Sequence, residues 1–250
     1  MARQAGILKL QGAVDDINFF KSKGKFRAGL KGEISAAKRA GASMEKVRNQ
    51  GQVFTRAASG SKVLRVALFG ALNKVPFQDV HTRLVRLLNK VIKGDKLHEP
   101  GQRTITDGNL ELLNRFNFNA KTQLLTSFFA PYTSNVDRVT GQMNLQVPAF
   151  LTGENVRPPQ GATHFKLIAT AAAVNFEKED FVSNNQSSVA FPLNQENTAA
   201  ITITNSITPN STDVLFHVLG ICFYQEVEGK MEVVGNGDSN ALAIIYVIAA

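Results

Sequence analysis

Two apolar runs near the C-terminal end constrain the fold of this chain most strongly. Residues 214–224 and 242–248 consist almost entirely of apolar side chains. Alternate side chains of a strand point to opposite faces of its sheet, so strands formed by these runs are apolar on both faces. Such strands need cover on both sides. Either helices from residues 59–93 or another subunit can supply that cover, and the sequence leaves both explanations open.

The rest of the C-terminal region also has the pattern of strands. From about residue 104 onward, short runs alternate between apolar and polar residues, as at residues 143–147 and 201–204. Clusters of glycine, asparagine, aspartate and proline separate these runs. About seven or eight strands with this spacing predict an antiparallel β-sandwich, jelly-roll-like, over residues 104–250. Leu110–Leu113 fits a strand or a helix, and we interpret it as a strand.

Helical periodicity precedes the strand region. Residues 59–73 carry an apolar face, and Ser59 or Ser61 is expected to cap the start of that helix. Residues 78–93 give a stronger signal, because their apolar side chains recur on one helical face and Gly94 follows where a helix commonly ends. Residues 33–58 are also compatible with a helix, but two glycines weaken the pattern.

The N-terminal segment predicts a small basic β-meander over residues 6–29. Its apolar runs are short, and turn residues at Asp15-Asp16 and Lys23-Gly24-Lys25 separate them. Three short strands make a poor core alone, so this piece needs a partner in its own chain or in another subunit. Its lysines can protect strand edges or form a docking surface. The residues expected at a subunit interface are Ile7, Leu10, Phe19, Phe20, Lys21, Lys23, Lys25, Phe26, Arg27 and Lys31.

These patterns predict an α+β protein. A basic N-terminal meander with helices is expected over residues 1–103, and the sandwich domain over residues 104–250. The charge follows a similar division. Residues 1–100 hold 20 Lys and Arg against 7 Asp and Glu, a net charge of +13, whereas residues 101–250 hold 8 against 13, a net charge of −5. Such segregation favours attraction between copies or binding of nucleic acid, although a charged surface also serves solubility alone.

The same basic region could bind nucleic acid. Phenylalanines interleave with lysines and arginines there, and aromatic faces can stack on bases while cations contact phosphate. The segment matches no RRM, KH, zinc-finger or double-stranded-RNA-binding-domain signature. The candidate nucleic-acid contacts are Lys38, Arg39, Lys46, Arg48, Arg83 and Arg86.

The sequence carries no motif for catalysis. Glycine-rich phosphate loops, HExxH and GxSxG are missing from the sequence, and the four histidines are widely spaced. His164 or His217 could act as a base beside Cys222, but a thiol within an apolar strand is usually inert packing. Glu177–Asp180 is interpreted as a solvated loop. We therefore expect no enzymatic activity, cofactor, metal or small-molecule substrate.

The expected location is the cytoplasm. The first residues lack the apolar segment of a secretory signal, and the apolar stretch 241–250 is too short to cross a bilayer as a helix. No membrane contact is expected.

Two stretches resemble a family of conserved proteins of Bacteroidota. They are MARQAGILKLQG with INFFKSKGKFRA at the start, and LGICFYQEVEGK near the end. The likeness spans the chain, but the shared motifs are structural, so the resemblance implies no activity and no site residues. The resulting prediction is a non-enzymatic structural protein that self-assembles into a filament, tubule or shell through charge-complementary subunit contacts. The alternative is a cytosolic nucleic-acid-binding protein.

Overall fold

The chain folds into two compact units of mixed helix and strand. This computed structural model describes residues 2–5, 8–32, 35–194 and 196–250. The first unit comprises Met1–Arg48 and the second Asn49–Ala250. The predicted division at residues 103 and 104 falls inside the second unit, because helices before it and strands after it share one apolar core. Among the described helices, none has both the length and the apolarity to cross a bilayer.

The first unit contains a four-stranded antiparallel sheet in the order β1-β4-β3-β2. The strands are β1 (Ala2–Arg3), β2 (Gly12–Val14), β3 (Ile17–Ser22) and β4 (Lys25–Leu30), and the short helices α1 (Ala36–Ala40) and η1 (Ala42–Met44) follow. The predicted turns are confirmed: Lys23 and Gly24 have φ of 49° and 77°, as a two-residue hairpin requires.

The expected first strand of the meander is placed differently. The apolar run at residues 7–10 was expected to form it, but Leu8 and Leu10 lie outside any strand, and β2 begins at Gly12. Ile7 lies outside the described residues. The backbone N–H of Leu10 instead donates to the side chain of Gln4, which ties this segment to the sheet without a strand ladder.

Helices α2 (Glu45–Ala67), α3 (Phe69–Leu72) and α4 (Val80–Lys93) precede the strands of the second unit. The predicted helix over residues 78–93 is confirmed, and most of its apolar face is buried, with Leu84, Leu88 and Ile92 all 0% exposed. The predicted cap at Ser59 or Ser61 is wrong, because both serines lie inside the 23-residue helix α2.

Nine strands of the second unit form two antiparallel sheets. The six-stranded sheet has the order β12-β11-β7-β8, with β13 also paired to β11 and β9 to β7; the three-stranded sheet has the order β10-β6-β5. The bounds are β5 (Thr133–Asp137), β6 (Gln142–Val147), β7 (His164–Asn175), β8 (Asp180–Ser187), β9 (Phe191–Pro192), β10 (Ile201–Ser206), β11 (Val214–Val227), β12 (Lys230–Val233) and β13 (Ala241–Ile248). The connections include η2 (Leu110–Leu113), α5 (Leu124–Ser127), α6 (Thr152–Asn155) and η3 (Val234–Gly237). Leu110–Leu113 is therefore a 3₁₀ helix, and the prediction of a strand there is wrong.

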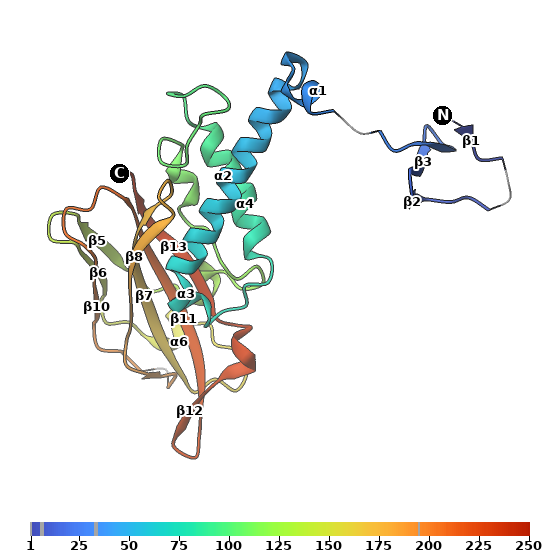
Figure 1. Cartoon of the computed structure of the whole chain (residues 1–250). Coiled ribbons are helices and arrows are strands. Elements are labelled where there is room, and N and C mark those ends of the chain that lie inside the picture. The colour runs from blue at the N-terminus through green and yellow to red at the C-terminus, as the bar shows by residue number, and fades with distance from the viewer. Residues whose placement is uncertain (1, 6–7, 33–34, 195) are drawn as a thin grey trace. The chain divides into compact units, whose positions relative to one another are not determined.

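The curled six-stranded sheet is covered on both faces, as the apolar runs of β11 and β13 require. Helices α2 and α4 lie over one face of this sheet (Figure 1). Alternate residues of β11, such as Phe216 and Val218, pack with these helices in one core. The residues between them, such as Leu219 and Ile221, pack with β6 and β10 in a second core. Of the two explanations that the sequence left open, cover by helices of the same chain is thus present.

Candidate functional site

The N-terminal sheet has one apolar face. The register pairs Val14 with Ile17, Ile17 with Leu30, and Lys21 with Phe26, so these side chains and Phe19 project to the same side. Val14 is 64% exposed, Ile17 43% and Leu30 82%. No described residue of the first unit is buried. An apolar sheet face therefore has no cover within its own unit.

The opposite face of this sheet is basic. Phe20 pairs with Arg27 and Ser22 with Lys25, and Arg3 lies beside Arg27 on β1. Lys21 is the one predicted interface lysine on the apolar face, where its Nζ lies 5.6 Å from the ring centroid of Phe26.

The structure thus distributes the predicted interface residues over two faces and a turn. Phe19, Lys21 and Phe26 share the apolar face, whereas Phe20, Lys25 and Arg27 share the basic face. Lys23 lies in the turn between β3 and β4, Lys31 follows β4, Leu10 precedes β2, and Ile7 is not described.

Two of the six candidate nucleic-acid residues have structural partners. The Arg48 guanidinium donates to the carbonyl oxygens of Arg39 and Gly41, at 2.6 and 2.8 Å. The Arg83 guanidinium donates to the carbonyl oxygens of Asn117, at 2.7 Å, and Phe118, and burial lowers its pKa. Arg83 therefore anchors α4 to the loop before α5 and is poorly placed for phosphate.

The other four candidates are exposed. Lys38 and Arg39 end α1, and Lys46 lies in α2. Arg86 lines a groove of about 330 Å³ between α2 and α4, together with Phe54 and Asn89.

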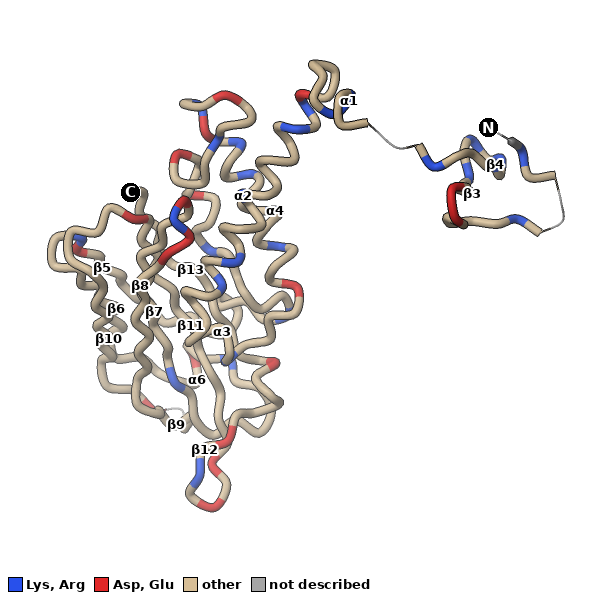
Figure 2. Tube along the Cα trace, viewed as in Figure 1, with Lys and Arg blue, Asp and Glu red and all other residues tan. Residues whose placement is uncertain are grey.

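Charge does not divide between the units as it divides between the halves of the sequence. The first unit holds 11 Lys and Arg against 4 Asp and Glu, a net charge of +7, and the second holds 17 against 16, a net charge of +1. The basic helices α2 and α4 belong largely to the second unit, which explains the difference. Acidic side chains gather there at the β7–β8 turn and at the β11–β12 hairpin (Figure 2).

The β11–β12 hairpin is an exposed acidic ribbon. Every residue from Gln225 to Val233 is exposed, and Glu226, Glu228 and Glu232 outnumber Lys230. The register pairs Glu226 with Met231 and Tyr224 with Val233, so one face combines a single carboxylate with three apolar or aromatic side chains. In the described part of the chain, β12 pairs with β11 alone, and its other edge is open.

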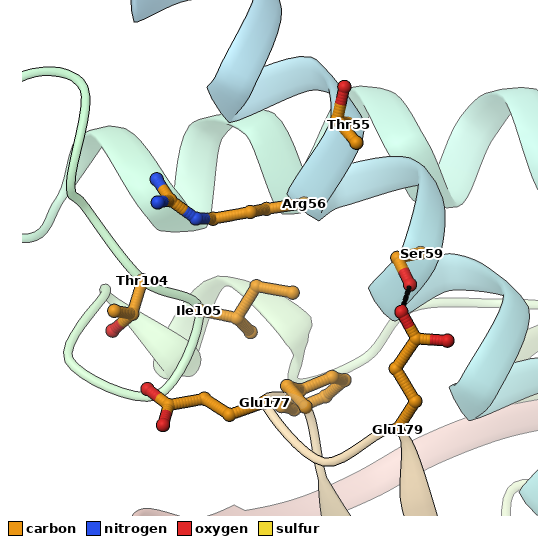
Figure 3. A pocket seen from close by; sticks show the side chains of 8 residues that line it. Thr55, Arg56, Ser59, Thr104, Ile105, Glu177 and Glu179 are labelled. Atoms are coloured by element: carbon orange, nitrogen blue, oxygen red, sulfur yellow. Dashed lines mark hydrogen bonds between the residues drawn. The ribbon is translucent and has the colours of Figure 1, made fainter.

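A cavity of about 380 Å³ lies beside α2 (Figure 3). The Arg56 guanidinium, on its wall, donates to the carbonyl oxygens of Gly101 and Arg103, at 2.6 and 3.0 Å. The Ser59 hydroxyl donates to the carboxylate of Glu179. These bonds fasten α2 to the neighbouring loops. The lining residues are Thr55, Arg56, Ser59, Thr104, Ile105, Phe176, Glu177 and Glu179. The cavity is large enough for a small ligand, and the Ser59 hydroxyl in its wall is held against the Glu179 carboxylate.

Asp95 organises the loop that follows α4. It is 0% exposed, and its carboxylate accepts hydrogen bonds from the backbone N–H groups of Leu97, His98 and Thr104 and from His98 Nδ1. Burial alone would raise the pKa of Asp95, but these donors hold it at about 2. Sequence reasoning missed this residue because its partners are mostly backbone groups.

Asp95, His98 and Asp107 place one possible ligand atom each within 4.8 Å of one another. Both carboxylate oxygens of Asp95 already accept two hydrogen bonds each, which accounts for its position without a cation. The cluster is a loop anchor.

No Cys–His pair forms from His217 and Cys222. The two side chains lie on opposite faces of β11, since their positions differ by an odd number. Burial raises the pKa of the Cys222 thiol to about 12, so no thiolate is available near neutral pH. His217 Nδ1 lies 2.7 Å from the Ser134 hydroxyl of β5, and burial lowers the pKa of His217 to about 4. His164 lies instead near the hairpin, with its Nε2 3.9 Å from Glu226 Oε2.

No family model, curated protein or solved structure matches this chain. The resemblance to conserved proteins of Bacteroidota is therefore an expectation that rests on the quoted segments alone.

Proposed function

We propose that this chain is a non-enzymatic, cytoplasmic structural subunit that assembles with copies of itself into a filament, tubule or shell. One observation carries the proposal: the apolar face of the N-terminal sheet is exposed, and none of the described residues of this unit is buried. A sheet face of this kind normally packs against another layer. In this proposal the other layer belongs to a neighbouring copy, and the packed sheets of the second unit act as a sandwich-like body that holds the docking surfaces apart.

The distribution of polar groups supports a structural role over catalysis. The buried polar side chains with resolved partners, such as Asp95 and Asn205, bond mostly to backbone groups that fix loops and strands. Arg56 and Arg83 are likewise bonded to carbonyl oxygens. Such groups position the fold and leave few free for chemistry.

Sedimentation velocity of the purified, nuclease-treated chain over a wide concentration range tests the proposal. Large species that persist after nuclease treatment are expected, and negative-stain images should show their form. A variant lacking residues 2–31 is expected to remain folded and to sediment as a monomer. A full-length chain that stays monomeric at high concentration and low ionic strength would overturn the proposal.

Nucleic-acid binding is the second candidate, favoured by the basic face of the same sheet. Arg3, Lys25 and Arg27 lie there beside Phe20, so cations and an aromatic ring share one surface. A fluorescently labelled single-stranded oligonucleotide should then bind with an affinity that falls steeply as salt increases. Unchanged oligonucleotide binding by the double variant Lys25→Glu/Arg27→Glu would show that this face is not the nucleic-acid-binding surface.

A further inference from the structure

We propose that the apolar face of the N-terminal sheet docks onto the β11–β12 hairpin of a second copy. This inference rests on the proposed self-assembly and names the surfaces that make the contact. On one side are Val14, Ile17, Phe19, Phe26 and Leu30 with Lys21. On the other side are Tyr224, Met231 and Val233 with Glu226.

The two surfaces match in composition. Each combines apolar or aromatic side chains with charged groups: Lys21 on the sheet, and Glu226 on the hairpin. Glu226 Oε2 lies 3.9 Å from His164 Nε2, and Lys166 Nζ lies 5.3 Å from the centroid of the Tyr224 ring at the inner end of this face. Met231 is 39% exposed and Val233 44%, so the hairpin face is itself an uncovered apolar strip. The contact would remove the apolar area of both surfaces from water, and it would place Lys21 near the opposite charge of Glu226.

Long-range charge also favours the hairpin over the exposed apolar residues of the basic helices α2 and α4. Exposed Phe54 lies in the groove that Arg86 lines, and Val66 lies beside Arg65 on α2. A first unit of net charge +7 is repelled there. The hairpin from Gln225 to Val233 holds three glutamates and one lysine, a net charge of −2, and attracts it.

The contact joins two different surfaces of the same chain. Each copy therefore offers a sheet to one neighbour and a hairpin to another. Heterologous contacts of this kind generate rings when the rotation closes and open helical polymers when it does not. The inference thus gives the proposed assembly a head-to-tail direction.

A charge swap in the full-length chain tests the pairing. Lys21→Glu and Glu226→Lys are each expected to weaken self-association by about tenfold or more, measured by sedimentation velocity at low salt. The double variant should recover most of the loss, because it restores the pair in reverse. Both positions are exposed, so far-UV circular dichroism should stay unchanged.

Two control variants make the same changes in net charge on the opposite faces. Lys25 lies on the basic face of the N-terminal sheet, and Glu232 lies on the other face of the hairpin. Lys25→Glu and Glu232→Lys are expected to change the association constant by less than about threefold. Removing apolar contact by Ile17→Ser or Met231→Ser should weaken association without any change in charge.

The outcomes separate the inference from the proposed function. A wild-type chain that never self-associates would contradict both the proposed function and the inference. Association that responds equally to Lys21→Glu and Lys25→Glu leaves the function standing and overturns the inference. Failure of the double variant to recover, when each single variant weakens association, shows that the two surfaces meet other partners and also overturns it. Carbodiimide cross-linking of mixed light and heavy copies should join Lys21 of one copy to Glu226 of another.

Discussion

At the scale of single residues, Asp95 shows how one buried charge determines the path of a loop. Three backbone N–H groups and one imidazole donate to its carboxylate. These hydrogen bonds are partly buried, so removing the acceptor takes a partner from four donors at a place that water reaches only in part. The cost of an unsatisfied buried donor is about 1–3 kcal/mol.

Asp95→Ala is therefore expected to lower the free energy of unfolding by at least about 2 kcal/mol. Urea denaturation followed by circular dichroism measures the change. Asp107→Ala is the matched control, because the Asp107 carboxylate is partly exposed and accepts from Thr104 alone among the resolved bonds. Equal losses in the two variants would contradict the anchoring role.

The burial of His217 leads to a prediction about the stability of the folded chain in acid. Its pKa is about 4 in the folded chain because burial disfavours the imidazolium, and the ordinary value is 6.5. The unfolded chain therefore binds this proton more readily, and stability is lost as the pH falls from about 6.5 toward 4. The loss from this group amounts to about 3 kcal/mol when fully developed. Unfolding free energies of the wild type and His217→Gln should diverge at pH 7 and converge as the pH approaches 4. Parallel curves would exclude the effect.

At the scale of elements, the close approach of α4 to the following loop depends on Gly108. A Cβ added at Gly108 would lie 2.4 Å from the carbonyl oxygen of Val91, which is too close for any real contact. The chain passes there only because glycine has no side chain.

Gly108→Ala is expected to destabilise the chain by about 1–3 kcal/mol, since the backbone must shift to admit the methyl group. Gly51→Ala provides the opposite case. Gly51 lies in α2 with nothing within 4 Å of an added Cβ, so alanine should stabilise the helix by about 0.5–1 kcal/mol. Thermal melts of both variants measure the difference. Changes in melting temperature of the same sign would contradict the close contact between Gly108 and Val91.

The sequence predicts elements well where burial is periodic and poorly where it is sparse. Alternation at residues 142–147 and 201–206 corresponds to β6 and β10, because every second side chain of each strand is buried. Residues 45–59 of α2 bury only Val53 and Ala57, so the apolar pattern was too faint to place the start of the helix at Glu45. Leu110–Leu113 buries two residues three apart, which a short run cannot distinguish from a strand.

At the scale of the whole molecule, the buried cores lie within the second unit. The described buried side chains begin at Val53 and extend through β13. The helices and the sheet share one core. The apolar runs at residues 214–224 and 242–248 indicated that such cover was needed, but they could not decide between helices of the same chain and another subunit. The candidate surfaces were predictable in part: the apolar and basic residues of the meander were identified, but their separation onto two faces depends on the register of β3 and β4.

A chain of residues 49–250 is therefore expected to fold cooperatively on its own. Its melting temperature should lie within about 3 °C of the melting temperature of the second unit in the full-length chain. The reason is that the removed residues contribute nothing to the described cores. Differential scanning calorimetry provides the comparison. A broad transition, or a fall of more than about 10 °C, would mean that the first 48 residues stabilise the body.

Strand β11 gives the molecule a mechanical property. It runs from the covered centre of the sheet, where β7 and β13 are bonded to its two edges, directly into the protruding hairpin. A force applied to the hairpin along β11 is therefore shared among many backbone hydrogen bonds that must shear together. A subunit pulled by that ribbon should resist extension far better than one pulled across the strands.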